Sequence, residues 1–216
     1  MTGPSPTRTI VLYGGSFDPI HAGHRHVARA CLARKDVAEV RFLVTPQPPH
    51  KRGRTLLPLA DRVELVEAAI AGEPRFAVDL TETQLPPPWY TFDTLRAVRA
   101  RVGPGHDVRF VIGADSLGDL PKWHRAAELV HETNFLTVPR DPNESLDAVF
   151  DRLATTFPAD DIARLRAGVL AVAPLPISST QIRDAIRGGR SIRGLVPDAV
   201  AARIAARGHY RNDVTG

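Results

Sequence analysis

The sequence has almost no cysteine and no long apolar run. Cys31 is the single cysteine among 216 residues, so a disulfide within this chain is impossible and a disulfide-rich secreted scaffold is excluded. No stretch approaches the roughly 18 consecutive apolar residues of a membrane-spanning helix. Met1 to Thr9 is polar and proline-rich, without the hydrophobic core of a signal peptide. We therefore expect a cytoplasmic protein with no membrane contact, in which Cys31 is a small apolar residue of a helix.

Charge of one sign and aromatic side chains are also scarce. The chain carries 28 basic and 24 acidic residues, a net charge of +4, and 6% aromatic residues. It has no run of about five or more like charges, which tails that bind nucleic acid often have. The mild positive balance therefore favours a small anionic ligand and predicts no nucleic-acid partner.

The histidines do not form a pattern typical of a metal site. His21, His24 and His50 are the candidates, but zinc sites need three or four nitrogen or sulfur ligands in a recognisable spacing. No cysteine accompanies these histidines, and the sequence has no His-Glu-x-x-His helix. We predict no metal held by protein side chains alone.

Length and composition indicate one globular domain. Apolar residues make up 43% and charged residues 24% of the chain, which are ordinary globular values. At about 150 residues per domain, 216 residues correspond to one domain with an elaboration. We predict a single domain over residues 1–216, with a flexible end at 1–8 and a surface excursion at 141–168 that holds one or two helices.

Strand and helix patterns alternate along the chain. Short apolar and β-branched runs predict strands, at Thr9–Tyr13, Val37–Val44, Arg75–Leu80, Val108–Ile112, Asn134–Val138 and Val169–Ala173. Apolar residues at helical spacing predict helices, at Ala22–Lys35, Leu59–Ala71, Thr91–Val102, Trp123–His131, Thr180–Arg187 and Asp198–Arg207. The alternation predicts an α/β fold: a Rossmann-like open parallel sheet with helices on both faces and a C-terminal helical extension. Ligands of such sheets bind beyond the carboxyl ends of the strands, so a site is expected in the segments after them.

The segment after the first predicted strand has the residues of a phosphate site. Gly14 and Gly15 allow a tight turn and the close approach of a ligand, and the helix start that follows offers N–H groups to an anion. His21 and His24 are three residues apart, so both can lie on one side of this helix start and meet phosphate oxygens. His26 breaks the spacing and is expected on the surface.

Six motifs follow in order along the chain, at Gly14–His24, Pro48–Lys51, Trp89–Leu95, Gly113–Asp115, Lys122–Trp123 and Ile177–Arg183. The first and last resemble the two signatures of the nucleotidylyltransferase superfamily. The middle ones resemble motifs of the bacterial nicotinate-mononucleotide adenylyltransferases, and the resemblance spans about Ile10 to Tyr210. It implies the transfer of AMP from ATP, accompanied by Mg²⁺, to nicotinate mononucleotide, with deamido-NAD and pyrophosphate as products.

The resemblance also implies which residues bind each substrate. Catalytic roles are implied for His21, His24 and Arg183. ATP contacts are implied for Gly14, Gly15, Ser16, Phe17, His21, His24, Lys51, Ser178, Ser179, Thr180 and Arg183. Mononucleotide contacts are implied for His50, Tyr90, Thr91, Gly113, Asp115, Trp123 and Arg140. Trp89 is a departure, because many relatives carry a small residue before the Tyr-Thr pair.

Several of these residues have a physical rationale of their own. Residues 178–180 are good helix N-caps whose hydroxyl and N–H groups can hold phosphate oxygens, and the guanidinium of Arg183 can grip a phosphate through two N–H groups. The start of the helix at Thr91 can meet a carboxylate. Trp123 can stack flat on a pyridine ring.

Two alternatives stay open at this point. One is another phosphate acceptor, such as nicotinamide mononucleotide or phosphopantetheine, and the other is a nucleotide-binding regulatory module without turnover. We expect nicotinate mononucleotide to be preferred, because no acidic residue lies between Pro86 and Phe92 to repel its carboxylate. Whether copies of the chain associate into a homo-oligomer is not indicated by the sequence.

Overall fold

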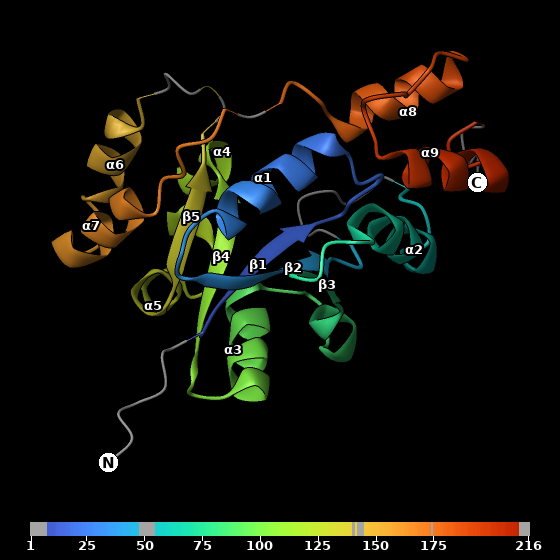
Figure 1. Cartoon of the computed structure of the whole chain (residues 1–216). Coiled ribbons are helices and arrows are strands. Elements are labelled where there is room, and N and C mark those ends of the chain that lie inside the picture. Colours follow the sequence, from blue (N-terminus) through green and yellow to red (C-terminus); the bar gives the residue numbers. More distant parts are fainter. Residues whose placement is uncertain (1–7, 48–54, 140, 142–144, 174, 212–216) are drawn as a thin grey trace.

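A five-stranded parallel sheet forms the centre of the protein (Figure 1). The structure, a computed structural model, describes residues 8–47, 55–139, 141, 145–173 and 175–211. The strands run in the order β3-β2-β1-β4-β5, and every neighbouring pair is parallel. Their bounds are Arg8–Gly15 (β1), Val37–Val44 (β2), Phe76–Asp79 (β3), His106–Gly113 (β4) and Asn134–Val138 (β5). Most of the end that was predicted to be flexible lies outside the described residues.

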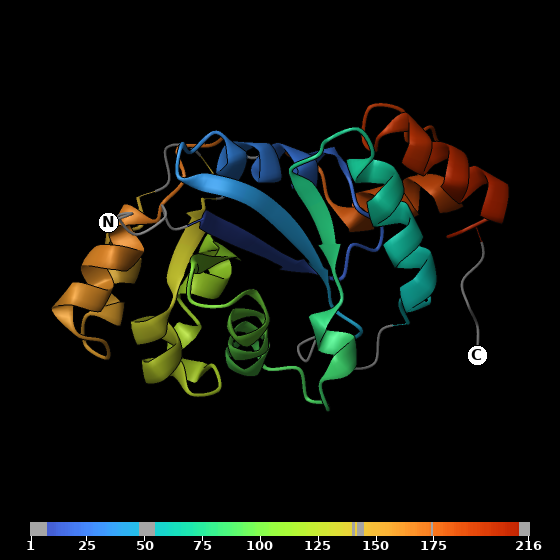
Figure 2. The same cartoon turned by 60° about the horizontal axis from the view of Figure 1, so that its bottom comes forward.

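Helices cover both faces of this sheet, as the alternating pattern predicted (Figure 2). The α-helices are Ala22–Leu32 (α1), Leu59–Ile70 (α2), Thr91–Val102 (α3), Ala114–Leu117 (α4), Ala126–Glu132 (α5), Asp147–Leu153 (α6), Ala159–Ala167 (α7), Ser179–Arg187 (α8) and Asp198–Arg207 (α9). Two short 3-10 turns are Thr81–Gln84 (η2) and Leu120–Lys122 (η3).

Alternation along β1 divides the interior into two apolar cores. Val11 faces the core beneath α1, α2, α8 and α9, whereas Ile10 and Leu12 face the core beneath α3 to α7. All three side chains are buried, as is Cys31 on α1, which packs in the first core. Because β1 is central and covered on both faces, its sequence is continuously apolar rather than alternating.

The direction of chain growth reverses at β1. The chain adds β2 and β3 on one side of β1 and then crosses over to add β4 and β5 on the other side. The carboxyl ends of β1 and β4 therefore border a crevice, which is the place where open parallel sheets bind ligands.

Two predicted elements differ from the structure. Val169–Ala173 is not a strand: the chain makes a single parallel bridge, between Val169 and Thr137, and does not continue the ladder. The predicted helix Trp123–His131 begins only at Ala126, because Trp123 has an extended backbone and Arg125 a left-handed one with φ 53°. These conformations separate Trp123 from the helix and leave its indole against the crevice.

The segment 141–168 is more than a surface excursion. Its two helices, α6 and α7, bury Phe150, Leu153, Ile162 and Leu165 in the core that also contains β4 and β5 side chains. The expectation came from the polar surface residues of this segment. The apolar residues at helical spacing between them pack against the sheet edge.

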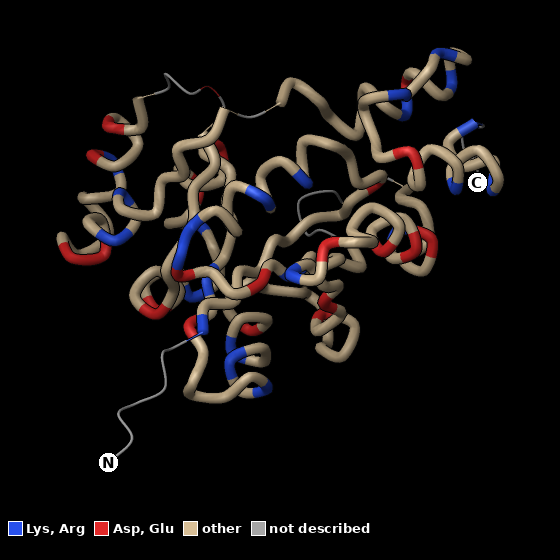
Figure 3. Tube along the Cα trace, viewed as in Figure 1, with Lys and Arg blue, Asp and Glu red and all other residues tan. Residues whose placement is uncertain are grey.

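The C-terminal helices extend the other core. Ile182 of α8 and Val200 and Ile204 of α9 are buried beside α1 and α2, at the right of Figure 1. Basic and acidic residues are interspersed along the helices that surround the sheet (Figure 3). Within the described residues, no helix combines the length and apolar character that crossing a membrane requires.

Candidate active site

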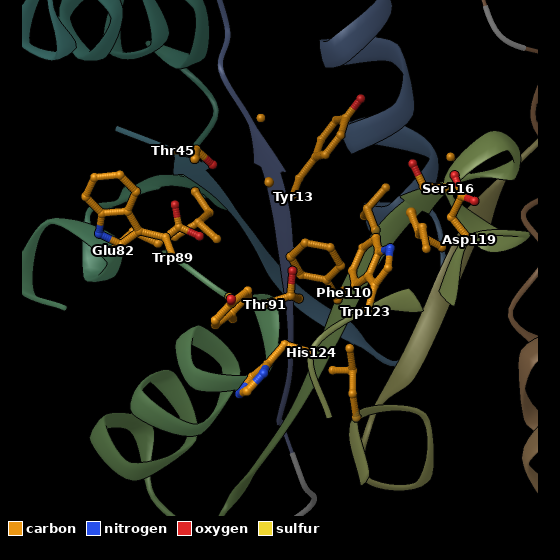
Figure 4. A pocket seen from close by; sticks show the side chains of 18 of the residues that line it. Tyr13, Thr45, Glu82, Trp89, Thr91, Phe110, Ser116, Asp119, Trp123 and His124 are labelled. Carbon is orange, nitrogen blue, oxygen red and sulfur yellow. The ribbon is translucent and has the colours of Figure 1, made fainter. Parts of the chain in front are cut away.

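A cavity of about 830 Å³ opens at the carboxyl ends of β1 and β4 (Figure 4). Its walls come from the ends of β1, β2 and β4, the start of α3, and the segment around η3. Seven of the predicted site residues line it, namely Gly14, Gly15, Ser16, Tyr90, Thr91, Gly113 and Trp123. The cavity therefore lies in the crevice where the topology predicted a ligand.

The other predicted residues lie elsewhere. Phe17, His21, His24 and Arg183 are not among the residues that line the cavity, although the rings of Phe17 and His24 lie 5.8 and 5.9 Å from the ring of Tyr13, which does line it. Asp115 is exposed in the first turn of α4, and Ser116 lines the cavity in its place. The predicted residues His50, Lys51 and Arg140 lie outside the described part of the chain.

The two glycines after β1 make room for aromatic rings as well as for a ligand. A Cβ at Gly14 would lie 3.0 Å from the Phe110 ring, and one at Gly15 would lie 3.0 Å from the Phe17 ring. Phe17 is 1% exposed and has a left-handed backbone with φ 45°. Any side chain at either glycine would push the turn away from the packed rings beneath it.

His21 and His24 form a stacked pair at the start of α1. Their ring centroids are 3.6 Å apart with 24° between the planes, and the backbone N–H of His21 donates to Nδ1 of His24 at 3.2 Å. Because Nδ1 of His24 accepts, a neutral His24 carries its proton on Nε2. Gly23 permits the stack, since a Cβ there would lie 3.0 Å from the His21 ring.

Burial makes His21 a neutral side chain. It is 6% exposed, its Nδ1 has no hydrogen-bond partner in the described structure, and desolvation lowers its pKa to about 4. The sequence left open whether His21 acts as an imidazolium or as an N–H donor. The structure favours the second, because an imidazole with this pKa carries no charge near neutral pH.

The second signature is tied directly to the first. Ser178 caps α8 through a reciprocal pair of bonds with Gln181, at 3.2 and 2.9 Å. The hydroxyl of Ser179 donates to the backbone carbonyl of Pro19 at 2.9 Å. The hydroxyl of Thr180 accepts from Nη2 of Arg183 at 2.9 Å. Ser179 therefore ties α8 to the segment before α1, whereas the hydroxyls of Ser178 and Thr180 bond within α8.

Asp18 joins four segments at this place. Arg183 donates to its backbone carbonyl and has Nη1 3.8 Å from its carboxylate. The same carboxylate accepts from the N–H of Leu57 at 3.3 Å and from the hydroxyl of Tyr210 at 2.9 Å. Asp18 is 2% and Arg183 is 6% exposed, so their attraction acts in a poorly hydrated environment. In this structure Arg183 holds the two signatures together.

Arg62 of α2 has a similar role for the loop after β2. It is 1% exposed and donates to the backbone carbonyls of Ser16, Thr45, Pro46 and Leu57 at 2.7 to 3.0 Å. It thereby fixes the base of the loop beside the glycine turn. This role of Arg62 was not predicted, although the residue stands on the apolar stripe of α2, three residues before buried Leu65.

Aromatic side chains line the cavity beside the start of α3. Tyr90 precedes α3 and stacks on His124, with ring centroids 4.2 Å apart and 18° between the planes. Thr91 begins α3. Trp89 and Trp123 line the cavity on opposite sides of Thr91 (Figure 4). Flat rings beside a helix N-terminus suit a planar ligand that bears a negative charge.

Other lining residues were given no substrate contact in the sequence-based prediction. They are Tyr13, Leu43, Thr45, Glu82, Trp89, Phe110, Val111, Ile112, Ser116, Asp119, Lys122, His124 and Leu129. Glu82 matters most among them, because it brings a buried carboxyl group to a place where acidic residues were thought to be absent. That expectation considered only the segment from Pro86 to Phe92, and the fold places Glu82 beside it.

The described residues contain no group of three or more His, Cys, Asp or Glu side chains arranged to hold a metal ion. The acidic residue nearest the two histidines in the chain is Asp18, whose carboxylate is occupied by Tyr210, Leu57 and Arg183. The donor groups here are imidazole nitrogens, hydroxyls and backbone N–H groups, whereas Mg²⁺ prefers carboxylate, carbonyl and water oxygens. The described side chains therefore do not fit a magnesium ion held by the protein.

Comparison with known proteins identifies the family. The cytidylyltransferase-like family model matches residues 12–185, from β1 into α8. A relative from Pseudomonas putida, named a probable nicotinate-nucleotide adenylyltransferase, is 37% identical over 98% of this chain and 99% of its own length. The chain belongs to the nicotinate-nucleotide adenylyltransferase family.

Other members of this family have the same extent. A probable nicotinate-nucleotide adenylyltransferase from Acidothermus cellulolyticus is 38% identical, covering 94% of each chain. Among solved structures, the Plasmodium falciparum nicotinic acid mononucleotide adenylyltransferase complexed with NaAD has a TM-score of 0.73 at 18% identity, over 94% of this chain and 97% of that one. That likeness shows the Rossmann-like fold of the family over nearly the whole chain.

Proposed function

We propose that this protein transfers AMP from ATP to nicotinate mononucleotide, producing deamido-NAD and pyrophosphate in NAD biosynthesis. The observation that carries the proposal is the cavity at the β1–β4 crevice. The glycine turn and Tyr13, whose ring lies 5.9 Å from the ring of His24, line one end, and aromatic rings and the α3 N-terminus lie at the other. One end suits a polyphosphate and the other a pyridine ring with a carboxylate, so the two substrates would meet between them.

In the proposed reaction, the 5′-phosphate of the mononucleotide attacks the α-phosphorus of ATP. A new P–O bond forms, the bond from the α-phosphorus to the bridging oxygen breaks, and pyrophosphate leaves with that electron pair. The acceptor phosphate is already ionised at neutral pH, so the protein has no need of a strong general base. Catalysis then consists of positioning the two phosphates and stabilising charge on the oxygens.

The histidine pair supplies hydrogen-bond donors for these oxygens. We assign the N–H groups of His21 and His24 to the α- and β-phosphates, with the turn at Gly14 to Ser16 against the backbone of the nucleotide. His21 is neutral, and the Nδ1 contact of His24 fixes its tautomer, so both rings are oriented before ATP binds. Donors fixed in advance cost little reorganisation when charge develops.

Arg183 and Ser179 belong to the departing pyrophosphate in this proposal. Their contacts to Asp18 and Pro19 hold α8 against the start of α1, so a shift of either signature moves the other. Mg²⁺ enters this proposal as the counter-ion of ATP, which keeps several of its water ligands. Lys51, His50 and Arg140 complete the proposed contacts from outside the described residues.

A pyrophosphate-release assay with a panel of acceptors tests the proposal. The panel contains ATP with nicotinate mononucleotide, nicotinamide mononucleotide or phosphopantetheine, and ATP alone. We expect rapid release with nicotinate mononucleotide and a much slower rate with phosphopantetheine. Release with phosphopantetheine alone would assign a different acceptor. ATP binding without release from any acceptor would indicate a regulatory nucleotide-binding module.

A further inference from the structure

Glu82 is a buried carboxyl group that faces the acceptor end of the cavity. It lies in η2, between β3 and α3, is 4% exposed, and lines the cavity beside Trp89 (Figure 4). Acidic side chains are rarely buried to this extent unless a partner compensates for the lost water. A carboxyl group buried in this way needs a hydrogen-bond partner in the protein or in a ligand.

One carboxyl oxygen of Glu82 is engaged and the other is not. Oε1 lies 3.2 Å from the hydroxyl of Thr94, and Oε2 is buried without a hydrogen-bond partner in the described structure. The Thr94 hydroxyl also lies 3.1 Å from the carbonyl oxygen of Tyr90. A hydroxyl has one proton to donate, so it cannot satisfy both oxygens at once. The described residues therefore give the Glu82 carboxyl group at most one hydrogen bond from Thr94, which is shared with the Tyr90 carbonyl, and none at Oε2.

The surroundings of Glu82 favour the acid form. Desolvation raises its pKa to about 7, and the nearby Asp79 carboxylate adds to the rise, whereas contacts with Thr45 and Thr94 oppose it. Asp79 is itself paired with Arg101 and lies 3.8 Å from Arg41. The other titratable or charged groups on the lining are Tyr13, Tyr90, Asp119, Lys122 and His124.

The position of Glu82 determines which part of a bound ligand its carboxyl group can contact. Its partner Thr94 is one helical turn beyond Thr91, where α3 begins. In the proposed function the N–H groups at this start of α3 receive the substituent on the pyridine ring. A carboxyl group next to them would meet the same substituent, which is a carboxylate in the nicotinate compound and an amide in the nicotinamide compound.

We propose that Glu82 is a specificity-determining residue for the acceptor, and that its acid form donates a hydrogen bond to the carboxylate of the nicotinate ring. This inference rests on the proposed function. When Glu82 is ionised it repels that carboxylate and accepts a hydrogen bond from an amide. The preference for the nicotinate compound therefore weakens as Glu82 loses its proton.

Binding of the two mononucleotides tests this inference without any turnover. Both tryptophans of the chain, Trp89 and Trp123, line the cavity, so quenching of intrinsic fluorescence reports its occupancy. The dissociation constants of nicotinate and nicotinamide mononucleotides are measured at pH 6 and pH 8.5. Their ratio cancels titration of the phosphate that both ligands carry, and His124 and the other lining groups are still present in every variant.

Glu82→Gln and Glu82→Ala are compared with Glu67→Gln, which makes the same change at an exposed position of α2. In the wild type we expect the preference for the nicotinate compound to fall about tenfold between the two pH values. Glu82→Gln keeps a donor that cannot ionise, so its preference stays constant. Glu82→Ala weakens binding of the nicotinate compound about tenfold or more and of the nicotinamide compound much less, and Glu67→Gln behaves like the wild type.

Three results would overturn the inference: a preference that does not change with pH in the wild type, an unchanged pH dependence in Glu82→Gln, or binding of neither mononucleotide. Equal weakening of both ligands in Glu82→Ala would show a structural role only. If Glu82→Ala does not fold, the pH dependence of the preference in Glu82→Gln and in the wild type still tests the inference. The protein could also bind the nicotinate compound in a way that depends on Glu82 and yet make no dinucleotide. That result would contradict the proposed function and support the inference about Glu82.

Discussion

The hydroxyl of Tyr210 donates a 2.9 Å hydrogen bond to the carboxylate of Asp18, across 192 residues of sequence. Tyr210 follows α9, and Asp18 lies between the glycine turn and the histidine pair. The bond therefore joins the C-terminal end of the described chain to the first signature, Gly14–His24. Since Asp18 also meets Arg183 and Leu57, its position depends on segments from both ends of the fold.

Tyr210→Phe should lower the free energy of unfolding by about 1 kcal/mol, because a buried carboxylate oxygen loses one donor. For a chain of this length, the melting temperature should fall by about 2–4 °C. Tyr90→Phe is the matched control, since Tyr90 is 37% exposed. A thermal melt of both variants measures the effect. Equal melting temperatures for Tyr210→Phe and the wild type would show that the bond contributes nothing to stability.

His24→Ala should lower kcat about a hundredfold, because it removes a donor that is oriented before charge develops on the phosphates. The loss of one such donor corresponds to roughly 3 kcal/mol of barrier. His26→Ala is the control, because His26 lies on the same helix as His24 but contacts the backbone carbonyl of Ala173. Steady-state release of pyrophosphate gives kcat for each variant. A folded His24→Ala protein with nearly normal kcat would contradict the assignment.

Arg183→Lys should lose much of kcat although the charge remains. A lysine ammonium cannot reach both the Asp18 carbonyl and the Thr180 hydroxyl with the fork of a guanidinium. The two signatures should then separate, and kcat should fall more than ATP affinity. Arg187→Lys, an exposed change on the same helix, is the control. If Arg183→Lys weakens ATP binding and leaves kcat unchanged, Arg183 acts in ground-state binding instead.

Burial of neutral His21 should make the protein less stable in acid. The unfolded chain protonates this residue near its ordinary pKa of 6.5, whereas the folded chain does so only at about 4. The free energy of unfolding therefore falls as the pH drops from about 6.5 to 4, by at most about 3 kcal/mol from this residue. Urea unfolding of His21→Gln and the wild type across this range should show a shallower fall in the variant. Parallel curves would mean that His21 titrates normally.

Glu82 should have the opposite effect on stability. Its pKa is about 7 in the folded protein and 4.5 in the unfolded chain, so the unfolded state releases the proton first as the pH rises. Between pH 4.5 and 7 this residue costs up to about 3 kcal/mol of stability. Glu82→Gln should therefore gain stability over the wild type as the pH rises through this window, and Glu67→Gln should not. A constant difference between Glu82→Gln and the wild type would contradict the raised pKa.

The sequence predicted the regular elements well where one physical signal dominated. The ranges Val37–Val44, Thr91–Val102, Asn134–Val138 and Asp198–Arg207 agree with β2, α3, β5 and α9 residue by residue. Each has a clear apolar period bounded by a proline, a glycine or a polar turn. Val169–Ala173 has the same composition as a strand but makes one bridge, because pairing at a sheet edge depends on the neighbouring chain as well as on propensity.

The candidate site was predictable in part. A site beyond the strand ends follows from the alternating pattern, and the glycine turn, the Thr91 helix start and Trp123 come from the segments after the strands. The strand order that places the crevice between β1 and β4 comes from the structure. Glu82 was not predictable, because a Thr-Glu-Thr-Gln segment looks like an exposed turn and only the fold shows it to be buried. The partners of Arg183 were not predictable either, since Asp18 lies 165 residues away.

Isotope transfer from the acceptor tests the central claim most directly. Nicotinate mononucleotide is prepared with ¹⁸O in its phosphate oxygens and allowed to react with unlabelled ATP, and the products are examined by mass spectrometry and ³¹P NMR. Attack of the acceptor phosphate on the α-phosphorus predicts deamido-NAD with ¹⁸O in the bridge between its two phosphorus atoms, and pyrophosphate without label. Label in the released pyrophosphate, or release of pyrophosphate with no labelled dinucleotide, would contradict the account.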